Sequence, residues 1–249
     1  YKGRIFYTLK DRINHRNHNK EGECKQMNLD FIQKYTDVLQ TYMPIYLQGA
    51  GYTISLSISS IIIGVILGTG LALMRMSPNK ILQKLAYGYI QIIRGTPLLV
   101  QLFIIYYGLY VINIELPDFL SGVIAISINS AAYIAEIIRS GIQAVDKGQM
   151  EAARSIGMSK RLAMQKIIYP QAVKNILPAL GNEVATLIKE TSIVSVLGLR
   201  DLMFASDIVR GATFMPFFPL VIVAVIYFIL TTSVSKLVDM LERKMKQSD

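Results

Sequence analysis

The sequence predicts an all-α membrane protein with about five transmembrane helices. Three observations support this fold class. Hydrophobic residues make up 52% of the 249 residues, charged residues make up only 17%, and the charges gather between long apolar runs. Soluble domains typically have about 25% charged residues. The net charge of +9 arises mainly from basic residues in the short segments between those runs, where they set orientation in a bilayer. We therefore expect a lipid bilayer around this protein, and no nucleic-acid partner.

Five apolar segments are long enough to cross a bilayer, which takes about 20 predominantly apolar residues. The second segment contains Thr96 and Pro97, a helix-capping residue followed by proline at the first helical position. Its apolar character already begins at Leu85, so an earlier start with a kink near Arg94 is the alternative. In chain order the segments are Gly49–Met74, Gly95–Ile114, Phe119–Ala135, Val173–Leu199 and Phe214–Val234.

These segments define one membrane domain over residues 49–240, with residues 241–249 as a cytoplasmic tail. Residues 27–48 are expected to be an extracytoplasmic lead-in to the first span. Residues 1–26 form a polar, basic tail without the apolar stretch of a signal peptide. This tail is either non-native or upstream sequence before a natural start at Met27, or a flexible extension of the protein.

Basic residues predict the orientation, because lysine and arginine concentrate in the cytoplasmic loops. Counted from Met27, 14 of them lie on the side that holds the loop after the third segment, against three on the other side. Five spans put the two ends of the chain on opposite sides. We therefore expect the N-terminus outside the cell, and the C-terminus and that loop in the cytoplasm.

The first segment carries small residues at every fourth position, and such residues form a groove that a second helix can approach closely. They are Ser60, Gly64, Gly68 and Ala72. The helix that packs there belongs either to the same chain or to a second copy.

The loop between the third and fourth segments has about 30 residues, and it is predicted to contain two short helices joined as an elbow (residues 146–170). Asp146 is a good N-cap for the first helix, and Gly157 can supply the left-handed residue that ends it. Ser159 caps the second helix, Lys160–Ile168, which we expect to stop before Pro170.

The elbow resembles the "EAA" loop of binding-protein-dependent ABC transporter permeases. The residues that carry this resemblance are Glu151, Ala152, Ala153, Gly157, Ile167 and Pro170. Tyr169 departs from the family pattern, which usually has leucine there. Further segments are similar to the subfamily that imports polar amino acids (histidine, glutamine, glutamate, arginine and opines). They are Arg94–Gln101, Ala132–Arg139, Lys147–Gln149 and Lys189–Ser192.

The resemblance implies a type I ABC importer permease fold in a bacterial plasma membrane. The elbow would dock in a groove of a separate ATPase, through Glu151, Ala152, Ala153, Arg154, Gly157 and Pro170. The family arrangement implies two ATPase copies, a second permease copy (the same chain or a related one) and an extracytoplasmic amino-acid-binding protein. The sequence has no phosphate-binding loop motif. ATP and magnesium would therefore be bound by the ATPase, and we expect no catalytic residue, metal or cofactor in this chain.

Polar residues within two apolar segments are candidates for a substrate site, because such groups usually face a cavity or a partner at membrane depth. Each set follows the helical repeat. The candidates are Asn129, Tyr133 and Glu136 in the third segment and Asn182, Glu183, Thr186 and Glu190 in the fourth. Pairing of Glu136 with nearby charges such as Arg139, and of Glu190 with Lys189, is the structural alternative.

Glu183 is the candidate for which a purely structural role is the weakest explanation. It could receive a cationic side chain or the ammonium group of a substrate. The acidic residues favour a basic amino acid such as arginine, lysine or histidine, with glutamine close behind. The competing functions are a secondary amino-acid transporter, which usually shows an inverted repeat, and a small membrane channel. A membrane enzyme ranks last.

Overall fold

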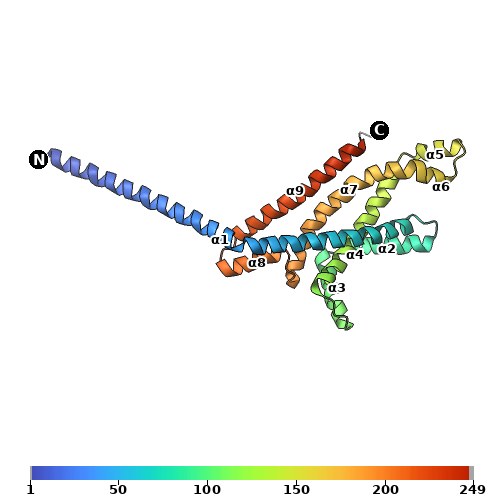
Figure 1. Ribbon diagram of the computed structural model, residues 1–249, viewed down its shortest axis with the longest axis horizontal. Helices are drawn as coiled ribbons and strands as arrows, with labels where there is room; N and C mark the ends of the chain where they lie inside the picture. The colour runs from blue at the N-terminus through green and yellow to red at the C-terminus, as the bar shows by residue number, and fades with distance from the viewer. Residues whose placement is uncertain (1, 247–249) are drawn as a thin grey trace.

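The structure is a computed structural model that describes residues 2–246, and the side chains of residues 32–245. Within this range all regular secondary structure is helical, so the predicted all-α class is confirmed (Figure 1). The apolar segments lie in α1 (Lys2–Arg75), α2 (Lys80–Gly95), α3 (Leu98–Val111), α4 (Asp118–Gln143), α7 (Tyr169–Glu190) and α9 (Phe218–Lys246). Between them lie α5 (Lys147–Ser155), α6 (Lys160–Ala163), the π-helical turn η1 (Met164–Ile168), the 3-10 helix η2 (Thr191–Leu197) and α8 (Leu202–Thr213).

Among the described residues, three helices are long and apolar enough to cross a membrane, namely residues 32–75 of α1, α4, and residues 218–245 of α9. Helices α2 and α3 meet that test only as a pair, and they are bent by 107° at the break between them. The second predicted segment is therefore two helices, and the break lies close to the kink expected near Arg94. Helix α7 has 22 residues, four of them charged. Its passage through the membrane stays a prediction, as does the number of five spans.

The lead-in expected at residues 27–48 is not a separate element, because α1 runs through it and into the first apolar segment. Pro44 lies inside this helix. Tyr46 and Ala50 are buried against α8 and α9 in one apolar cluster, and this packing stabilises the helix beyond the proline. The predicted tail, residues 1–26, falls in the part of the chain whose side chains are not described, and residue 1 and residues 247–249 lie outside the described residues.

Helix α4 lies in the small-residue groove of α1. Ser60, Gly64, Gly68 and Ala72 are all buried. A Cβ atom at Gly68 would lie 2.8 Å from Cβ of Ile134 and 2.9 Å from the carbonyl oxygen of Ala131, and Gly64 packs in the same way on Ser130. Residue numbers at these contacts increase in the same direction along both helices, so α1 and α4 are parallel. Of the two partners considered for this groove, the structure places α4 of the same chain there.

Helix α8 was not predicted, because its 12 residues are too few for a span. Asp201 caps it by accepting hydrogen bonds from the backbone N–H groups of Met203 (3.2 Å) and Phe204 (2.9 Å). The N–H of Leu202 donates to Oγ1 of Thr53 in α1 at 3.1 Å. These bonds fix α8 against α1 at the end of the helix bundle opposite the elbow, and the N-terminal part of α1 extends beyond it (Figure 1). The aspartate cap before an apolar stripe is the sequence signal that could have revealed it.

Candidate functional site

The first half of the elbow forms as predicted. Asp146 caps α5 by accepting a hydrogen bond from the N–H of Gly148 at 2.6 Å. Gly157 has φ +89°, the left-handed region in which a residue with a side chain is strained. At this end of α5, the N–H of Met158 donates to the carbonyl of Ala153 at 3.1 Å, and the N–H of Gly157 donates to the carbonyl of Arg154 at 3.1 Å. This pair of bonds is the Schellman motif, which ends a helix and satisfies its last carbonyls.

The second half of the elbow differs from the prediction, because its helix does not end before Pro170. Ser159 caps α6 by accepting from the N–H of Leu162 at 3.3 Å, but α6 then passes through η1 directly into α7. The N–H of Tyr169 donates to the carbonyl of Met164, five residues back. Pro170 follows in the first turn of α7, where its missing N–H is tolerated. The wider π turn thus lets the helix continue through the proline.

The elbow has an apolar inner side and an exposed tip. Ala153 and Ala163 are almost completely buried, and Val145 packs with Ile168 of η1 in the cluster that joins the elbow to α4 and α7. Ile156, by contrast, is 79% exposed beside Gly157. The remaining predicted elbow residues Glu151, Ala152, Arg154 and Pro170 are exposed as well. The tip is therefore a rigid surface with an uncovered isoleucine.

The break between α2 and α3 is held by Gln101, which is only 6% exposed. Its Nε2 atom donates to the carbonyls of Ile93 (2.7 Å) and Thr96 (3.0 Å) and to Oγ1 of Thr96 (2.8 Å). Its Oε1 atom accepts from Nδ2 of Asn129 in α4 at 2.9 Å. Asn129, a predicted substrate residue, is therefore engaged in supporting the break. Pro97, and not Thr96, is the N-cap of α3.

Gln101 is the functional residue that the sequence analysis missed. Its signal was present, since an amide in an otherwise apolar segment needs a partner at membrane depth. The side chain satisfies carbonyl groups that the broken helix leaves without intrahelical donors. This contact stabilises the non-helical backbone at the break between α2 and α3.

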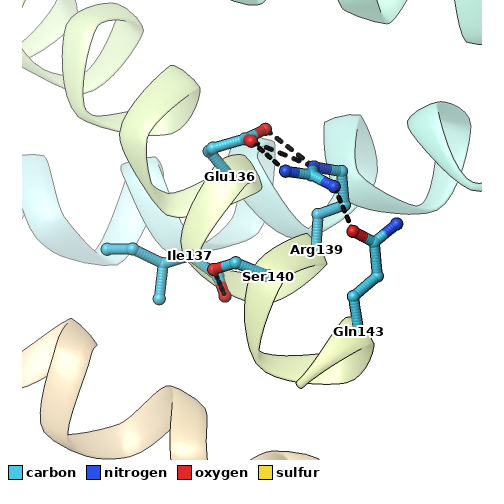
Figure 2. A network of polar contacts seen from close by, with 5 residues as sticks. All are labelled: Glu136, Ile137, Arg139, Ser140 and Gln143. Carbon is cyan, nitrogen blue, oxygen red and sulfur yellow. Dashed lines mark hydrogen bonds and ion pairs between the residues drawn. The ribbon is translucent and has the colours of Figure 1, made fainter. Parts of the chain in front are cut away.

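Glu136 pairs with Arg139 on the same face of α4, which is the structural alternative considered for it. Nε of Arg139 donates to both carboxylate oxygens at 3.0 Å. A terminal nitrogen of Arg139 also contacts the carboxylate, and the other contacts the amide oxygen of Gln143. Figure 2 shows the guanidinium between the two acceptors. Both charged side chains remain partly exposed.

Tyr133 lies one turn before Glu136 and contacts a different cation. The guanidinium carbon of Arg94, near the end of α2, lies 5.4 Å from the centre of the Tyr133 ring. This distance is within the range of a cation–π interaction. Arg94 itself is exposed on the surface of the protomer.

Helix α7 runs antiparallel to α4. Near the elbow, Gly141 packs directly on Ile176, and Nδ2 of Asn175 donates to the Gly141 carbonyl at 3.4 Å. Towards the other end, Ile126 and Leu187 share a core cluster. This register places Tyr133 level with about residue 183. Tyr133 and Glu183 therefore lie at about the same level along the α4–α7 contact.

We use the name polar groove for Tyr133 of α4 together with Asn182, Glu183, Thr186 and Glu190 of α7. Asn182 is exposed in it, and Glu183, Thr186 and Glu190 are partly buried. Among the described residues, the carboxylate of Glu183 makes no hydrogen bond or ion pair within its own chain. The described residues also contain no group of three or more histidine, cysteine or acidic side chains placed to hold a metal ion. These residues offer hydrogen-bonding and charged groups on α4 and α7.

Comparison with known proteins identifies the family. The family described as "Binding-protein-dependent transport system inner membrane component" matches residues 39–247. A putative glutamine transport system permease protein of Rickettsia conorii is 46% identical over 199 residues, which are 80% of this chain and 91% of that protein. An arginine transport system permease protein of Bacillus subtilis is 41% identical over 224 residues, which are 90% of this chain and all of that protein.

Solved structures agree with this assignment. The crystal structure of an amino acid ABC transporter with histidines has 50% sequence identity and a TM-score of 0.80, and the match covers 83% of this chain and 96% of that one. The MetNI methionine ABC transporter shares the fold, with a TM-score of 0.69 at 17% identity over 82% of this chain and 97% of that one. The resemblance noted in the sequence is therefore confirmed. The chain belongs to the family of binding-protein-dependent transport system inner membrane components.

Proposed function

We propose that this chain is the permease subunit of an ATP-driven amino-acid importer, and that a separate ATPase drives its alternating access. The observation that carries the proposal is the elbow. Its two helices are capped, its alanines Ala153 and Ala163 are packed inside, and its tip exposes Ile156. Since α6, η1 and α7 are continuous, a partner bound at the tip is connected directly to a helix that lines the polar groove.

The family supports the following set of proposed partners. Two ATPase copies would bind ATP and magnesium, and each would hold one elbow through Glu151, Ala152, Arg154 and Gly157. A second permease copy, identical or related, would complete the membrane part, and an extracytoplasmic binding protein would deliver the amino acid. In this arrangement the chain performs no catalysis. The charge distribution supports an N-terminus outside the cell and a C-terminus and elbow in the cytoplasm.

The polar groove is the proposed substrate site. Asn182, Glu183 and Thr186 offer polar groups on one face of α7, and Tyr133 lies at about the same level on α4. A carboxylate without a partner in its own chain is expensive at membrane depth. An ammonium or guanidinium group of a substrate would supply that partner for Glu183. Relatives named for arginine and for glutamine fit a polar amino acid, and we favour a basic one.

The function is tested by purifying the chain together with a partner ATPase and reconstituting the complex in liposomes. We expect ATP hydrolysis to rise when the binding protein and one polar amino acid are added, and we expect uptake to require ATP. Uptake driven by an ion gradient without the ATPase would instead support a secondary transporter. Uptake of ions down their gradient would support a channel.

Replacing Glu183 with glutamine is expected to weaken substrate binding by about tenfold or more, because a neutral amide cannot replace a charge-assisted hydrogen bond. The measurement is the concentration of amino acid that gives half-maximal stimulation of ATP hydrolysis. Glu115→Gln, in an exposed loop, is the control and should behave as the wild type. An unchanged half-maximal concentration and substrate preference in Glu183→Gln would exclude Glu183 from the site.

A further inference from the structure

Arg94 is a cation at membrane depth without an acidic partner of its own. Among the described contacts it has the ring of Tyr133 and no hydrogen bond. Glu136, whose carboxylate lies within electrostatic range of Arg94 and Arg75, already accepts hydrogen bonds from Arg139. Arg139 therefore already occupies the carboxylate of Glu136, and Arg94 adds a second positive charge beside Tyr133.

The depth of Arg94 follows from the parallel packing of α1 and α4. Gly64 lies against Ser130 and Gly68 against Ile134, so Tyr133 is level with about residue 67 of α1. That position is about 12 Å along the helix from Arg75, at a rise of 1.5 Å per residue. A hydrocarbon core of about 30 Å therefore includes the level of Tyr133 and the guanidinium above it. A cation held there usually faces a polar cavity or a ligand.

The neighbouring helix α7 carries a negative charge at about the same level. Glu183 of α7 is level with Tyr133, and its carboxylate has no partner among the described residues of the chain. A zwitterionic amino acid carries an ammonium group and a carboxylate on one carbon atom. We propose that Arg94, held against the ring of Tyr133, binds the α-carboxylate of the transported amino acid. This inference rests on the proposed function. It adds the residue that binds the carboxylate, which is the group that amino acids have and amines lack.

The chemistry of arginine suits this task. The planar guanidinium donates two parallel hydrogen bonds to a carboxylate, which a lysine ammonium cannot do in the same geometry. The contact with the ring holds the guanidinium beside Tyr133, and among the described contacts its N–H groups make no hydrogen bond. Arg94 is therefore a specificity-determining residue, and its loss affects ligands with a carboxylate much more than ligands without one.

The experiment compares each amino acid with its decarboxylated amine. Radiolabelled arginine, agmatine, histidine and histamine are bound to the purified permease–ATPase complex without the binding protein, so that only the groove selects. The wild-type complex should prefer the amino acid. Arg94→Gln should lower the affinity for the amino acid by about tenfold or more and leave the affinity for the amine unchanged. Arg94→Lys should lose part of the preference.

Arg75→Gln is the matched control, because Arg75 also lies over a tyrosine ring, that of Tyr87 at 4.6 Å, but at the end of α1. It should keep the wild-type preference. The proposal is overturned if Arg94→Gln keeps the preference, or if it loses amino acid and amine equally. If Arg94→Gln does not fold, an unchanged preference in a folded Arg94→Lys overturns it. A wild-type complex that binds neither amino acid contradicts the proposed basic substrates instead, and the comparison is then made with glutamine and 4-aminobutanamide.

Discussion

Replacing Gly68 with leucine is expected to prevent α1 and α4 from packing together. Any side chain at this position would meet Ile134 and the carbonyl oxygen of Ala131 at less than 3 Å, and a backbone atom cannot move aside as the end of a flexible side chain can. We expect a loss of about 3 kcal/mol or more of stability. For a chain of this size, that loss corresponds to a melting temperature lower by about 6–12 °C, measured by intrinsic fluorescence in detergent.

Gly70 supplies the control on the same helix. A Cβ atom there has no neighbour within 4 Å, so Gly70→Leu adds an apolar side chain that faces outward. Its melting temperature should stay within about 2 °C of the wild type, the range of ordinary surface substitutions. Equal stability of the two variants would mean that the small-residue groove of α1 is not occupied by α4.

Replacing Gly157 with valine is expected to uncouple ATP hydrolysis from the substrate. Nothing lies within 4 Å of a Cβ atom at this position, so the effect comes from the backbone, whose φ of +89° costs a β-branched residue about 1–2 kcal/mol or more. The Schellman motif then rearranges and Ile156 moves away from its place beside the turn. If the elbow docks on the ATPase, substrate-stimulated hydrolysis should fall by about tenfold.

Asparagine tolerates the left-handed conformation better than other residues with side chains. Gly157→Asn should therefore retain most of the stimulation, while both variants should keep the melting temperature of the membrane part within a few degrees. The coupling role of the elbow is contradicted if Gly157→Val is stimulated by substrate as strongly as the wild type. It is equally contradicted if asparagine and valine have the same effect.

Much of the fold could be predicted because membrane helices and helix caps leave local signals. Uncharged runs marked α1, α4 and α9, and Asp146, Gly157 and Ser159 marked the helix ends in the elbow. The continuation through Pro170 could not be predicted in this way, because proline usually ends a helix and the π turn that accommodates it has no local signature. Helix α8 is too short to stand out, and its position depends on a contact with Thr53, far away in the sequence.

The candidate site was predictable in part. The helical repeat put Glu183 with Asn182 and Thr186 on one face of α7, and it identified the face of α4 with Tyr133. It could not show that Asn129 is bound to Gln101, because that contact forms only when α3 bends back on α4. It also could not decide between a ligand and Arg139 as the partner of Glu136. Pairing between side chains on different helices depends on tertiary packing, which a single sequence does not reveal.

The uninterrupted helix from α6 through η1 into α7 has a mechanical consequence. From Lys160 to Glu183 it measures about 35 Å at the rise of an α-helix. Pro178 lies inside this length and removes one backbone hydrogen bond from it. A rotation of about 10° at the elbow would displace Glu183 by about 6 Å if the helix turned as one body. If the segment turns as one body, a small movement at its cytoplasmic end is sufficient to change the position of Glu183 relative to Tyr133.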